Sequence, residues 1–351
     1  AQTDPAYIFL TSGSTGTPKA ILGTHQGLSH FLAWQRETFV IGPDDRVAQL
    51  TGLSFDPILR DIFLPLTSGG VLCLPEESDR ADGGTILRWL DREQITVLHT
   101  VPTVAQYWLA DVPPEVTFVK MRWVFFAGEP LTDGLIHQWR AAFPHSGHQI
   151  NLYGTTETTL VKAFYQIPTD PPVGVQPIGS PLPQTQLLVV TPEQQLCGIG
   201  ELGEIVIRTP FSTLGYLNVA PEQAQGFRPN PFTQEEADVW YWTGDRGRYR
   251  LDGTVEILGR RDDQVKVRGV RIEPGEVMSV LNRMPQIRSS FVTGRKTEQD
   301  ETVLVAYVVP TQPGGITASE IRTAVNQTLP PAFVPNVVTL MEELPRTPNG
   351  K

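Results

Sequence analysis

Near its start the chain reads Tyr7-Ile8-Phe9-Leu10-Thr11-Ser12-Gly13-Ser14-Thr15-Gly16-Thr17-Pro18-Lys19. The first four residues form an apolar run that predicts a β-strand. The segment from Thr11 to Lys19 combines small hydroxyl residues, two glycines and a lysine. Glycines let a backbone turn tightly and approach a polyanion, and N–H groups, hydroxyls and an ammonium bind phosphate oxygens. Taken alone, this composition fits a phosphate-binding loop or an ordinary solvated turn.

Two common nucleotide-binding motifs do not account for this loop. The Walker motif needs four residues between its glycines and then Gly-Lys-Ser/Thr, whereas two residues separate Gly13 from Gly16 and Ala20 follows Lys19. A literal Gly-x-Gly-x-x-Gly occurs at Gly198, Gly200 and Gly203. The residues after it alternate like a strand, and a dinucleotide fingerprint should open a helix. We therefore predict a turn between two strands there.

Further motifs follow in a fixed order along the chain. They are Asn151-Leu152-Tyr153-Gly154-Thr155-Thr156-Glu157, Gly200-Glu201-Leu202-Gly203-Glu204-Ile205, Tyr241-Trp242-Thr243-Gly244-Asp245, Gly259-Arg260-Arg261-Asp262-Asp263-Gln264-Val265-Lys266-Val267-Arg268-Gly269 and Leu344-Pro345-Arg346-Thr347-Pro348-Asn349-Gly350-Lys351. In this order and spacing, the set resembles the adenylate-forming enzymes, and among them the adenylation domains of nonribosomal peptide synthetases. The resemblance extends from Tyr7 to Lys351.

Composition narrows the class of protein. The chain has 351 residues, enough for a large core and more than one domain, and its 40% apolar and 19% charged content is ordinary for a globular protein. The net charge of −10 argues against nucleic acid as the main partner. No apolar run approaches the ~20 residues needed to cross a bilayer, and no signal peptide is evident, so we expect no membrane partner. Cys73 and Cys197 lack metal-ligand spacing, and a reducing cytoplasm is the expected compartment.

The phosphate loop of the resembled family lies well inside its large domain, whereas here it begins at Thr11. The chain also ends on the lysine of the family's last motif. We therefore expect a fragment lacking the N-terminal part of the large domain, with apolar surface exposed where that part would pack.

The order of strand and helix patterns predicts an α/β fold. Strand-like runs at 47–50, 71–74, 97–100 and 123–126 alternate with helix candidates at 28–38, 58–66, 103–109 and 132–143, which predicts α/β layers around a mostly parallel sheet. From Val161 to Leu258 short strands with Gly and Pro turns predict a β-rich part.

A domain boundary is expected near Asp262. Downstream, helices at 274–284 and 318–329 and strands at 289–293 and 303–309 predict a compact α+β unit. We expect a large core domain at residues 1–261 and a small domain at 262–351. The resemblance implies that the small domain is a mobile lid, that Asp262 is its hinge, and that rotation brings either Lys351 or the loop around Gly269 to the active site.

The resemblance implies that a carboxylate attacks the α-phosphate of ATP and that pyrophosphate leaves. Charge then accumulates on phosphorus oxygens, so cations and oriented N–H donors should dominate catalysis. It assigns the β- and γ-phosphates to Thr11, Ser12, Gly13, Ser14, Thr15, Gly16 and Lys19.

The motif at 151–157 supplies most of the remaining nucleotide contacts that the resemblance implies. Tyr153, followed by Gly154, would stack on adenine; the alternative is a core aromatic, which is the more ordinary role for a tyrosine taken alone. Thr156 would reach the α-phosphate or the substrate carboxylate, and Glu157 would bind Mg²⁺, which prefers carboxylate oxygen. Thr155 stands where the family commonly has proline. The segment Ala127-Gly128-Glu129 would line the adenine pocket.

Three further residues complete this implied site. Asp245 would accept hydrogen bonds from the ribose hydroxyls, with a turn aspartate before Arg246-Gly247 as the alternative. Arg260 would also approach the ribose. Lys351 would bridge the substrate carboxylate and the α-phosphate, although a terminal lysine is otherwise often a disordered end.

The family's specificity positions fall on nine residues, namely Asp56, Pro57, Arg60, His99, Phe125, Ala127, Leu152, Leu160 and Val161. Asp56 would pair with the α-amine of an amino acid, since an aliphatic or aryl acid would leave a buried carboxylate unpaired. The alternative for Asp56 is a helix N-cap before Pro57.

Arg60 and His99 allow two alternatives for the chemical class of the substrate side chain. If both face the pocket, they receive a carboxylate or polar group, and the set from Asp56 to Phe125 resembles that of fungal aminoadipate reductases. Leu152, Leu160 and Val161 depart from that set. Alternatively, Arg60 pairs with Asp61, Glu76 or Glu77, and the pocket takes an aliphatic or aromatic amino acid.

The function implied by the resemblance is formation of an aminoacyl adenylate and transfer to the phosphopantetheine thiol of a carrier domain, with a condensation domain expected nearby. The alternatives are a carboxylic-acid–CoA ligase, an aminoadipate-reductase-like adenylation domain and a non-catalytic module. Asp56 and the sequence Gln264-Val265-Lys266-Val267-Arg268-Gly269 disfavour the CoA ligase. Retention of Glu157, Asp245 and Lys351 disfavours the non-catalytic module.

Overall fold

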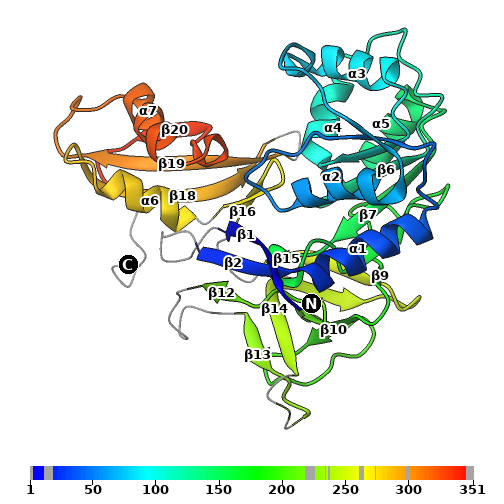
Figure 1. The fold of residues 1–351 in the computed structure, drawn as a ribbon. Coiled ribbons are helices and arrows are strands. Elements are labelled where there is room, and N and C mark those ends of the chain that lie inside the picture. The colour runs from blue at the N-terminus through cyan, green and yellow to red at the C-terminus, as the bar shows by residue number, and fades with distance from the viewer. Residues whose placement is uncertain are drawn as a thin grey trace. The chain divides into compact units, whose positions relative to one another are not determined.

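The computed structural model describes residues 3–11, 19–217, 226–233, 235, 238–260, 265–272, 274–297 and 301–344. The chain divides into two compact units (Figure 1). The larger contains residues 1–10 and 20–261, and the smaller contains 11–19 and 262–351.

A seven-stranded sheet forms the centre of the larger unit. Its strand order is β4 (Val71–Cys73), β3 (Arg46–Ala48), β5 (Val97–Thr100), β6 (Trp123–Ala127), β7 (His148–Tyr153), β8 (Ala163–Gln166) and β9 (Ser180–Pro181). The first five run parallel to one another, β8 runs antiparallel to β7, and β9 runs antiparallel to β8. Helix α1 (His25–Thr38) precedes these strands in the chain. Between them lie α2 (Pro57–Ser68), α3 (Gly83–Arg92), α4 (Pro102–Leu109) and α5 (Asp133–Ala142), with 3₁₀ turns η1 (Ser78–Arg80) and η2 (Thr156–Thr158). The expectation of an α/β core around a mostly parallel sheet is confirmed.

Both faces of this sheet are buried, as parallel strands require. Along β6, Phe125 belongs to an apolar cluster with residues of α1 and α2, whereas Val124 and Phe126 belong to a second cluster with residues of α3, α4 and α5. Val97 and Leu98 on β5 divide in the same way. Because strand side chains alternate with a period of two, each odd-numbered residue named here faces α1 and α2.

The helices begin close to where the sequence predicts, with one exception. Helix α1 starts at His25, three residues before the expected Leu28, because the Thr24 side chain accepts a hydrogen bond from the Gly27 N–H at 3.1 Å. Helix α3 was not predicted. It begins with Gly83-Gly84, a pair that normally disfavours helix, and Asp82 caps it by accepting from the Thr85 N–H at 2.7 Å.

Two further sheets complete the larger unit. One has the order β1 (Pro5–Thr11), β2 (Lys19–Thr24), β12 (Tyr216–Leu217), and the other has β10 (Gln186–Val190), β11 (Gly203–Arg208), β14 (Val239–Tyr249), β13 (Phe227–Pro229), with β15 (Val255–Arg260) also paired to β14. The Gly198–Gly203 segment lies between the antiparallel strands β10 and β11, so the predicted turn between strands is confirmed.

The smaller unit is an α+β fold, as expected. It contains the pair β16 (Val265–Val267) and β17 (Val270–Ile272), and the sheet β18 (Ile287–Lys296), β19 (Thr302–Pro310), β20 (Val337–Leu340), with helices α6 (Pro274–Asn282) and α7 (Ala318–Thr328) and the 3₁₀ turn η4 (Pro331–Phe333). Strand β18 pairs antiparallel and β20 parallel to β19. A full capping box, Thr317 with Glu320, starts α7.

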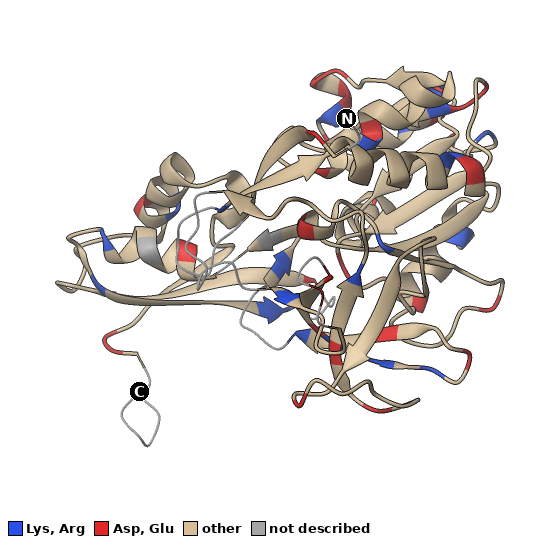
Figure 2. Ribbon diagram, turned by 60° about the horizontal axis from the view of Figure 1, so that its bottom comes forward, with Lys and Arg blue, Asp and Glu red and all other residues tan. Residues whose placement is uncertain are grey.

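Charges are interspersed over the described ribbon (Figure 2). Among the described residues, none of the helices has the length and apolar character required to cross a membrane.

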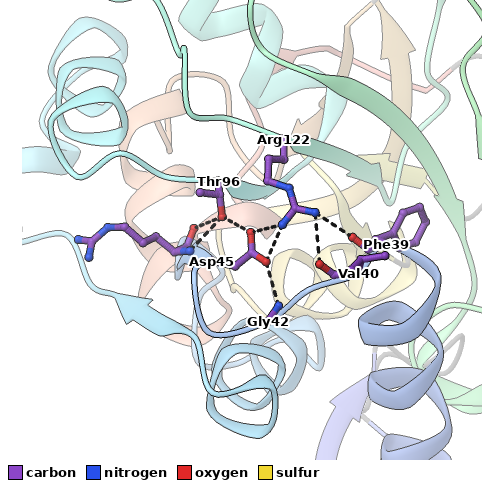
Figure 3. A network of polar contacts seen from close by, with 7 residues as sticks. Phe39, Val40, Gly42, Asp45, Thr96 and Arg122 are labelled. Atoms are coloured by element: carbon purple, nitrogen blue, oxygen red, sulfur yellow. Dashed lines mark hydrogen bonds and ion pairs between the residues drawn. The ribbon is translucent and has the colours of Figure 1, made fainter.

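A buried carboxylate ties the ends of several elements together (Figure 3). Asp45 accepts from Arg122 at 2.8 Å, from the Thr96 hydroxyl at 2.6 Å and from the Gly42 N–H at 2.9 Å. Arg122 also donates to the carbonyl of Val40 at 3.2 Å. Asp45 is 1% exposed, so its carboxylate takes its hydrogen bonds from these protein donors and not from water.

Asp45→Ala is therefore expected to destabilise the protein by about 2–3 kcal/mol, since the buried Thr96 hydroxyl, the Gly42 N–H and the Arg122 guanidinium lose this acceptor. Chemical denaturation followed by circular dichroism measures this. Asp44→Ala, the exposed neighbouring position, serves as the control. Equal stability of the two variants would show that the network contributes little.

Candidate active site

The site residues gather where parallel strands end. Strands β5, β6 and β7 run parallel, so their carboxyl ends lie at one edge of the sheet, the usual position of ligand sites in open α/β sheets. His99, Ala127 and Tyr153 lie on the last two residues of these strands. The 3₁₀ turn η2, which carries Thr156 and Glu157, follows β7 directly.

Tyr153, Asp245 and Arg260, expected to bind adenine and ribose, lie together. The Tyr153 hydroxyl donates to Asp245 Oδ2 at 2.6 Å, and Arg260 Nη1 donates to Asp245 Oδ1 at 2.5 Å. Asp245 and Arg260 are paired in register on β14 and β15. Because Asp245 lies within a strand, the alternative of a turn aspartate is wrong.

This trio is largely closed off from water. Tyr153 is 5% exposed and Asp245 2%. Burial, and then the neighbouring Asp245 carboxylate, raise the pKa of Tyr153 well above its usual value. Tyr153 therefore remains a hydrogen-bond donor at all physiological pH values.

Asp56 and Thr156 lie side by side although 100 positions separate them. The Thr156 hydroxyl donates to Asp56 Oδ1 at 3.0 Å. Asp56 stands immediately before α2, yet its side chain makes no capping hydrogen bond. Burial, together with the nearby Glu157, raises the pKa of Asp56 to about 6, against the effect of the Thr156 hydrogen bond. The carboxylate thus faces the motif at 151–157 and leaves the α2 N–H groups without a side-chain cap.

Glu157 is fully buried and held by residues that sequence reasoning missed. Its Oε1 accepts from the Tyr216 hydroxyl at 2.8 Å, and its backbone carbonyl accepts from the Thr213 hydroxyl at 2.7 Å. Neither Tyr216 nor Thr213 belongs to a motif that the sequence analysis used. The described residues contain no group of three or more His, Cys, Asp or Glu side chains that could hold a metal ion by themselves.

The loop after η2 is unusually tight. Thr159 and Leu160 both have positive φ, 64° and 58°, which is uncommon for residues with a Cβ. A Cβ on Gly154 would lie 2.0 Å from the Leu160 carbonyl oxygen, so only glycine allows this approach. Lys162, fully buried, donates from Nζ to the Thr159 carbonyl at 3.0 Å. Burial lowers the pKa of Lys162 to about 7.

Arg60 and His99 lie in one buried polar network. Arg60 pairs with Asp61 at 3.1 Å, and the His99 ring stacks on Phe125 with centroids 4.8 Å apart. The Gln35 amide nitrogen lies 2.7 Å from His99 Nε2. Leu152, Leu160 and Val161 belong to the buried apolar cluster beside α1 and α2, and Ala127 and Pro57 are half-buried.

For the other predicted residues the structure gives single contacts or no description. Glu129, after the positive-φ Gly128, accepts the Thr103 N–H at 2.9 Å at the start of α4. Thr11 donates to the Lys19 carbonyl at 3.3 Å. Outside the described residues lie Ser12, Gly13, Ser14, Thr15, Gly16, Asp262 and Lys351.

Comparison with known families identifies the chain's class. The family model described as AMP-binding enzyme matches residues 1–217, and that of the AMP-binding enzyme C-terminal domain matches residues 276–351. The chain belongs to the AMP-binding enzyme family. The resemblance to adenylate-forming enzymes is thereby confirmed.

Individual relatives of this AMP-binding chain support the narrower resemblance to adenylation domains. It is 34% identical over 349 residues to a dimodular nonribosomal peptide synthase of Bacillus subtilis, covering 99% of this chain and 14% of the synthase. It is 32% identical over 393 residues to the L-2-aminoadipate reductase of Schizosaccharomyces pombe, covering 97% of this chain and 27% of the reductase.

A solved structure confirms the fold. The Vibrio cholerae adenylation domain AlmE, in complex with glycyl-adenosine-5′-phosphate, matches with a TM-score of 0.85 and 30% identity over 99% of this chain and 65% of that chain. This AMP-binding chain thus spans 14% and 27% of the length of these two curated relatives, and 65% of the solved adenylation domain.

Proposed function

We propose that this AMP-binding chain activates an amino acid. The amino-acid carboxylate oxygen attacks the α-phosphorus of ATP, the bond to the bridging oxygen of pyrophosphate breaks, and aminoacyl-AMP and pyrophosphate result. The carbonyl carbon of that mixed anhydride is then attacked by the phosphopantetheine thiol of a carrier domain, and AMP leaves.

One observation carries this proposal. Asp56, a half-buried carboxylate, lies within hydrogen-bonding distance of Thr156, beside Glu157. None of the ion pairs found among the described residues includes Asp56, and Arg60, which favours its charged form, is itself paired with Asp61. A carboxylate that is withdrawn from water without an ion-pair partner is costly, and a substrate ammonium group would supply that partner. A carboxylic acid without an amine does not.

The nucleotide would bind across the same strand ends. The ribose hydroxyls would take the place of one of the present partners of Asp245, and the Tyr153 ring would lie against adenine. The loop Thr11–Lys19 would hold the β- and γ-phosphates, and Lys351 would bridge the carboxylate and the α-phosphate. Asp262 would be the hinge between the core domain 1–261 and the lid domain 262–351.

Mg²⁺ fits the residues present. Glu157 offers a carboxylate oxygen, and Mg²⁺ in nucleotide sites commonly takes one or two carboxylates together with phosphate oxygens and waters. When bound, the ion would neutralise phosphate charge. The Tyr216 hydrogen bond to Glu157 orients the carboxylate for this role.

Substrate-dependent ATP–pyrophosphate exchange by the full-length protein tests the proposal. A panel of free amino acids and their des-amino analogues is compared. We expect exchange with one or a few amino acids and at least 100-fold less with the corresponding des-amino acids. Exchange with des-amino acids alone would place the protein among the carboxylic-acid–CoA ligases. Exchange with neither would favour a non-catalytic module.

A further inference from the structure

The buried network around Arg60 bears on the substrate side chain. Arg60 Nε and Nη2 both lie 3.1 Å from Asp61 Oδ1, and the two side chains are 6% and 0% exposed. Since the two groups carry opposite charges, the pair as a whole is neutral. The positive charge that made Arg60 a candidate receptor for an acidic substrate is therefore compensated within the chain.

Asp61 is held in place by a further residue. Its Oδ2 accepts from the Thr51 hydroxyl at 2.6 Å and from the Thr51 N–H at 3.3 Å. With Oδ1 bound to Arg60, both carboxylate oxygens are engaged. An arriving substrate carboxylate would have to compete with a fixed, fully buried anion for Arg60, and would lie close to that anion.

His99 adds no charge to this network. Burial, and then the neighbouring Arg60, lower the pKa of His99 well below its usual value, so the ring is neutral. When the Gln35 amide donates to His99 Nε2 at 2.7 Å, the ring proton is on Nδ1. That atom lies 3.8 Å from Asp61 Oδ1 and has no hydrogen-bond partner in the described part of the chain.

On the basis of the proposed function, we infer that the site selects an amino acid with an uncharged side chain, and that Asp61 enforces this choice by neutralising Arg60. An acidic side chain would bring a second carboxylate to a pair that is already balanced, and an uncompensated buried charge is strongly unfavourable.

A basic side chain is disfavoured for a related reason. Asp61 has no free oxygen to accept its hydrogen bonds, and the Arg60 guanidinium would repel it. Three other mapped positions, Leu152, Leu160 and Val161, are aliphatic and belong to the buried apolar cluster beside α1 and α2. Of the two alternatives left open by the sequence, the contacts of Arg60 favour the apolar or neutral pocket.

The first test uses substrate pairs of matched shape and different charge. In pyrophosphate exchange by the full-length protein we compare glutamine with glutamate and asparagine with aspartate, and include 2-aminoadipate, ornithine and the apolar amino acids. We expect the best substrate to be uncharged, with a kcat/KM at least tenfold above that of any acidic or basic amino acid. A preference for glutamate, aspartate, 2-aminoadipate or ornithine would overturn the inference and leave the proposed function intact. Exchange with des-amino acids alone would overturn both.

The second test removes the compensating charge. Asp61→Asn keeps the shape of the side chain but leaves Arg60 buried without an anion, so an acidic substrate becomes its counter-ion. We expect the ratio of kcat/KM for glutamate to that for glutamine to rise at least tenfold over the wild type. The double variant Arg60→Gln, Asp61→Asn should lack that gain, and Asp79→Asn, which alters an aspartate paired with Arg92 at 3.2 Å, should keep the wild-type ratio. An unchanged ratio in a folded Asp61→Asn protein would overturn the role of Asp61.

Discussion

Replacing Asp56 with alanine is expected to lower kcat/KM for the amino-acid substrate by about 100-fold or more, because it removes the anion proposed to pair with the α-ammonium group. Truncating one partner of a buried charge pair typically costs about 2–5 kcal/mol. The same variant should lose little with des-amino analogues, which have no ammonium to pair. The measurement is pyrophosphate exchange with an amino acid and its des-amino analogue at matched pH.

Stability distinguishes this role from helix capping. The pKa of Asp56 is raised from 3.8 to about 6, so ionisation is easier in the unfolded chain. The contribution of Asp56 to stability is therefore fully present below about pH 4 and is lost as pH rises through about 6. At pH 8, Asp56→Ala should be as stable as the wild type or more stable, by no more than about 1–2 kcal/mol because the side chain is only half-buried.

Thermal unfolding at pH 5 and pH 8 provides this readout. A helix cap lost to alanine costs about 1 kcal/mol at both pH values. If Asp56→Ala is destabilised at pH 8 and keeps its preference for amine-bearing substrates, Asp56 caps α2 and the amine-pairing role is wrong. Thr24→Ala, which removes a cap that the structure does show, calibrates the size of a true capping loss.

Local patterns account for most of the fold. The runs at Val97–Thr100 and Trp123–Phe126 predict strands because β-rich apolar residues are bounded by turns, and both are found within a residue of the expected ends. Helix α3 escaped prediction because Gly83-Gly84 opens it. Close packing, with the Cα of Trp108 only 3.2 Å from a Cβ built on Gly83, gives that glycine a tertiary reason which a single sequence does not reveal.

The residues of the site were predictable from the sequence, but most of their contacts were not. The sequence motifs identified Tyr153, Asp245 and Arg260 as candidate site residues. The hydrogen bonds among them join strands β7, β14 and β15, and no local sequence pattern predicts that these strands meet. The Thr156–Asp56 contact spans 100 positions and is set by the tertiary fold.

Supporting residues were missed for a simpler reason. Gln35, Lys162 and Tyr216 belong to none of the motifs, and in sequence each resembles an ordinary surface polar residue. Gln35 and Lys162 are fully buried, and Tyr216 is found only through its contact with Glu157. The one sequence feature that could have indicated a buried lysine is the position of Lys162 immediately after the apolar pair Leu160-Val161.

Asp245→Asn is expected to raise the KM for ATP on the order of 100-fold at saturating amino acid. Asp245 is a buried acceptor whose two oxygens bind Tyr153 and Arg260. An amide presents only one acceptor oxygen and no charge for Arg260, and losing a charge-assisted hydrogen-bond partner in a buried site costs about 2–4 kcal/mol. The KM for the amino acid should change much less, because Asp56 and Thr156 are untouched.

Analogues of the nucleotide show whether the loss occurs at the ribose. The wild type should bind ATP more tightly than 2′-deoxy-ATP or 3′-deoxy-ATP, whereas Asp245→Asn should bind the three almost equally, since the acceptor that tells them apart is gone. Asp252→Asn, on the exposed turn between β14 and β15 and 54% accessible, is the matched control and should behave as the wild type.

Tyr153→Phe separates the two partners of Asp245. It removes the 2.6 Å hydrogen bond but keeps the aromatic ring proposed to lie against adenine, so its effect on the KM for ATP should stay within about tenfold. If Asp245→Asn retains the full preference of the wild type for ATP over its deoxy analogues, Asp245 does not receive the ribose hydroxyls. Its bonds to Tyr153 and Arg260 would then serve only to fasten β7 to the β14–β15 hairpin, and unfolding of the variant at lower temperature would accompany an unchanged nucleotide selectivity.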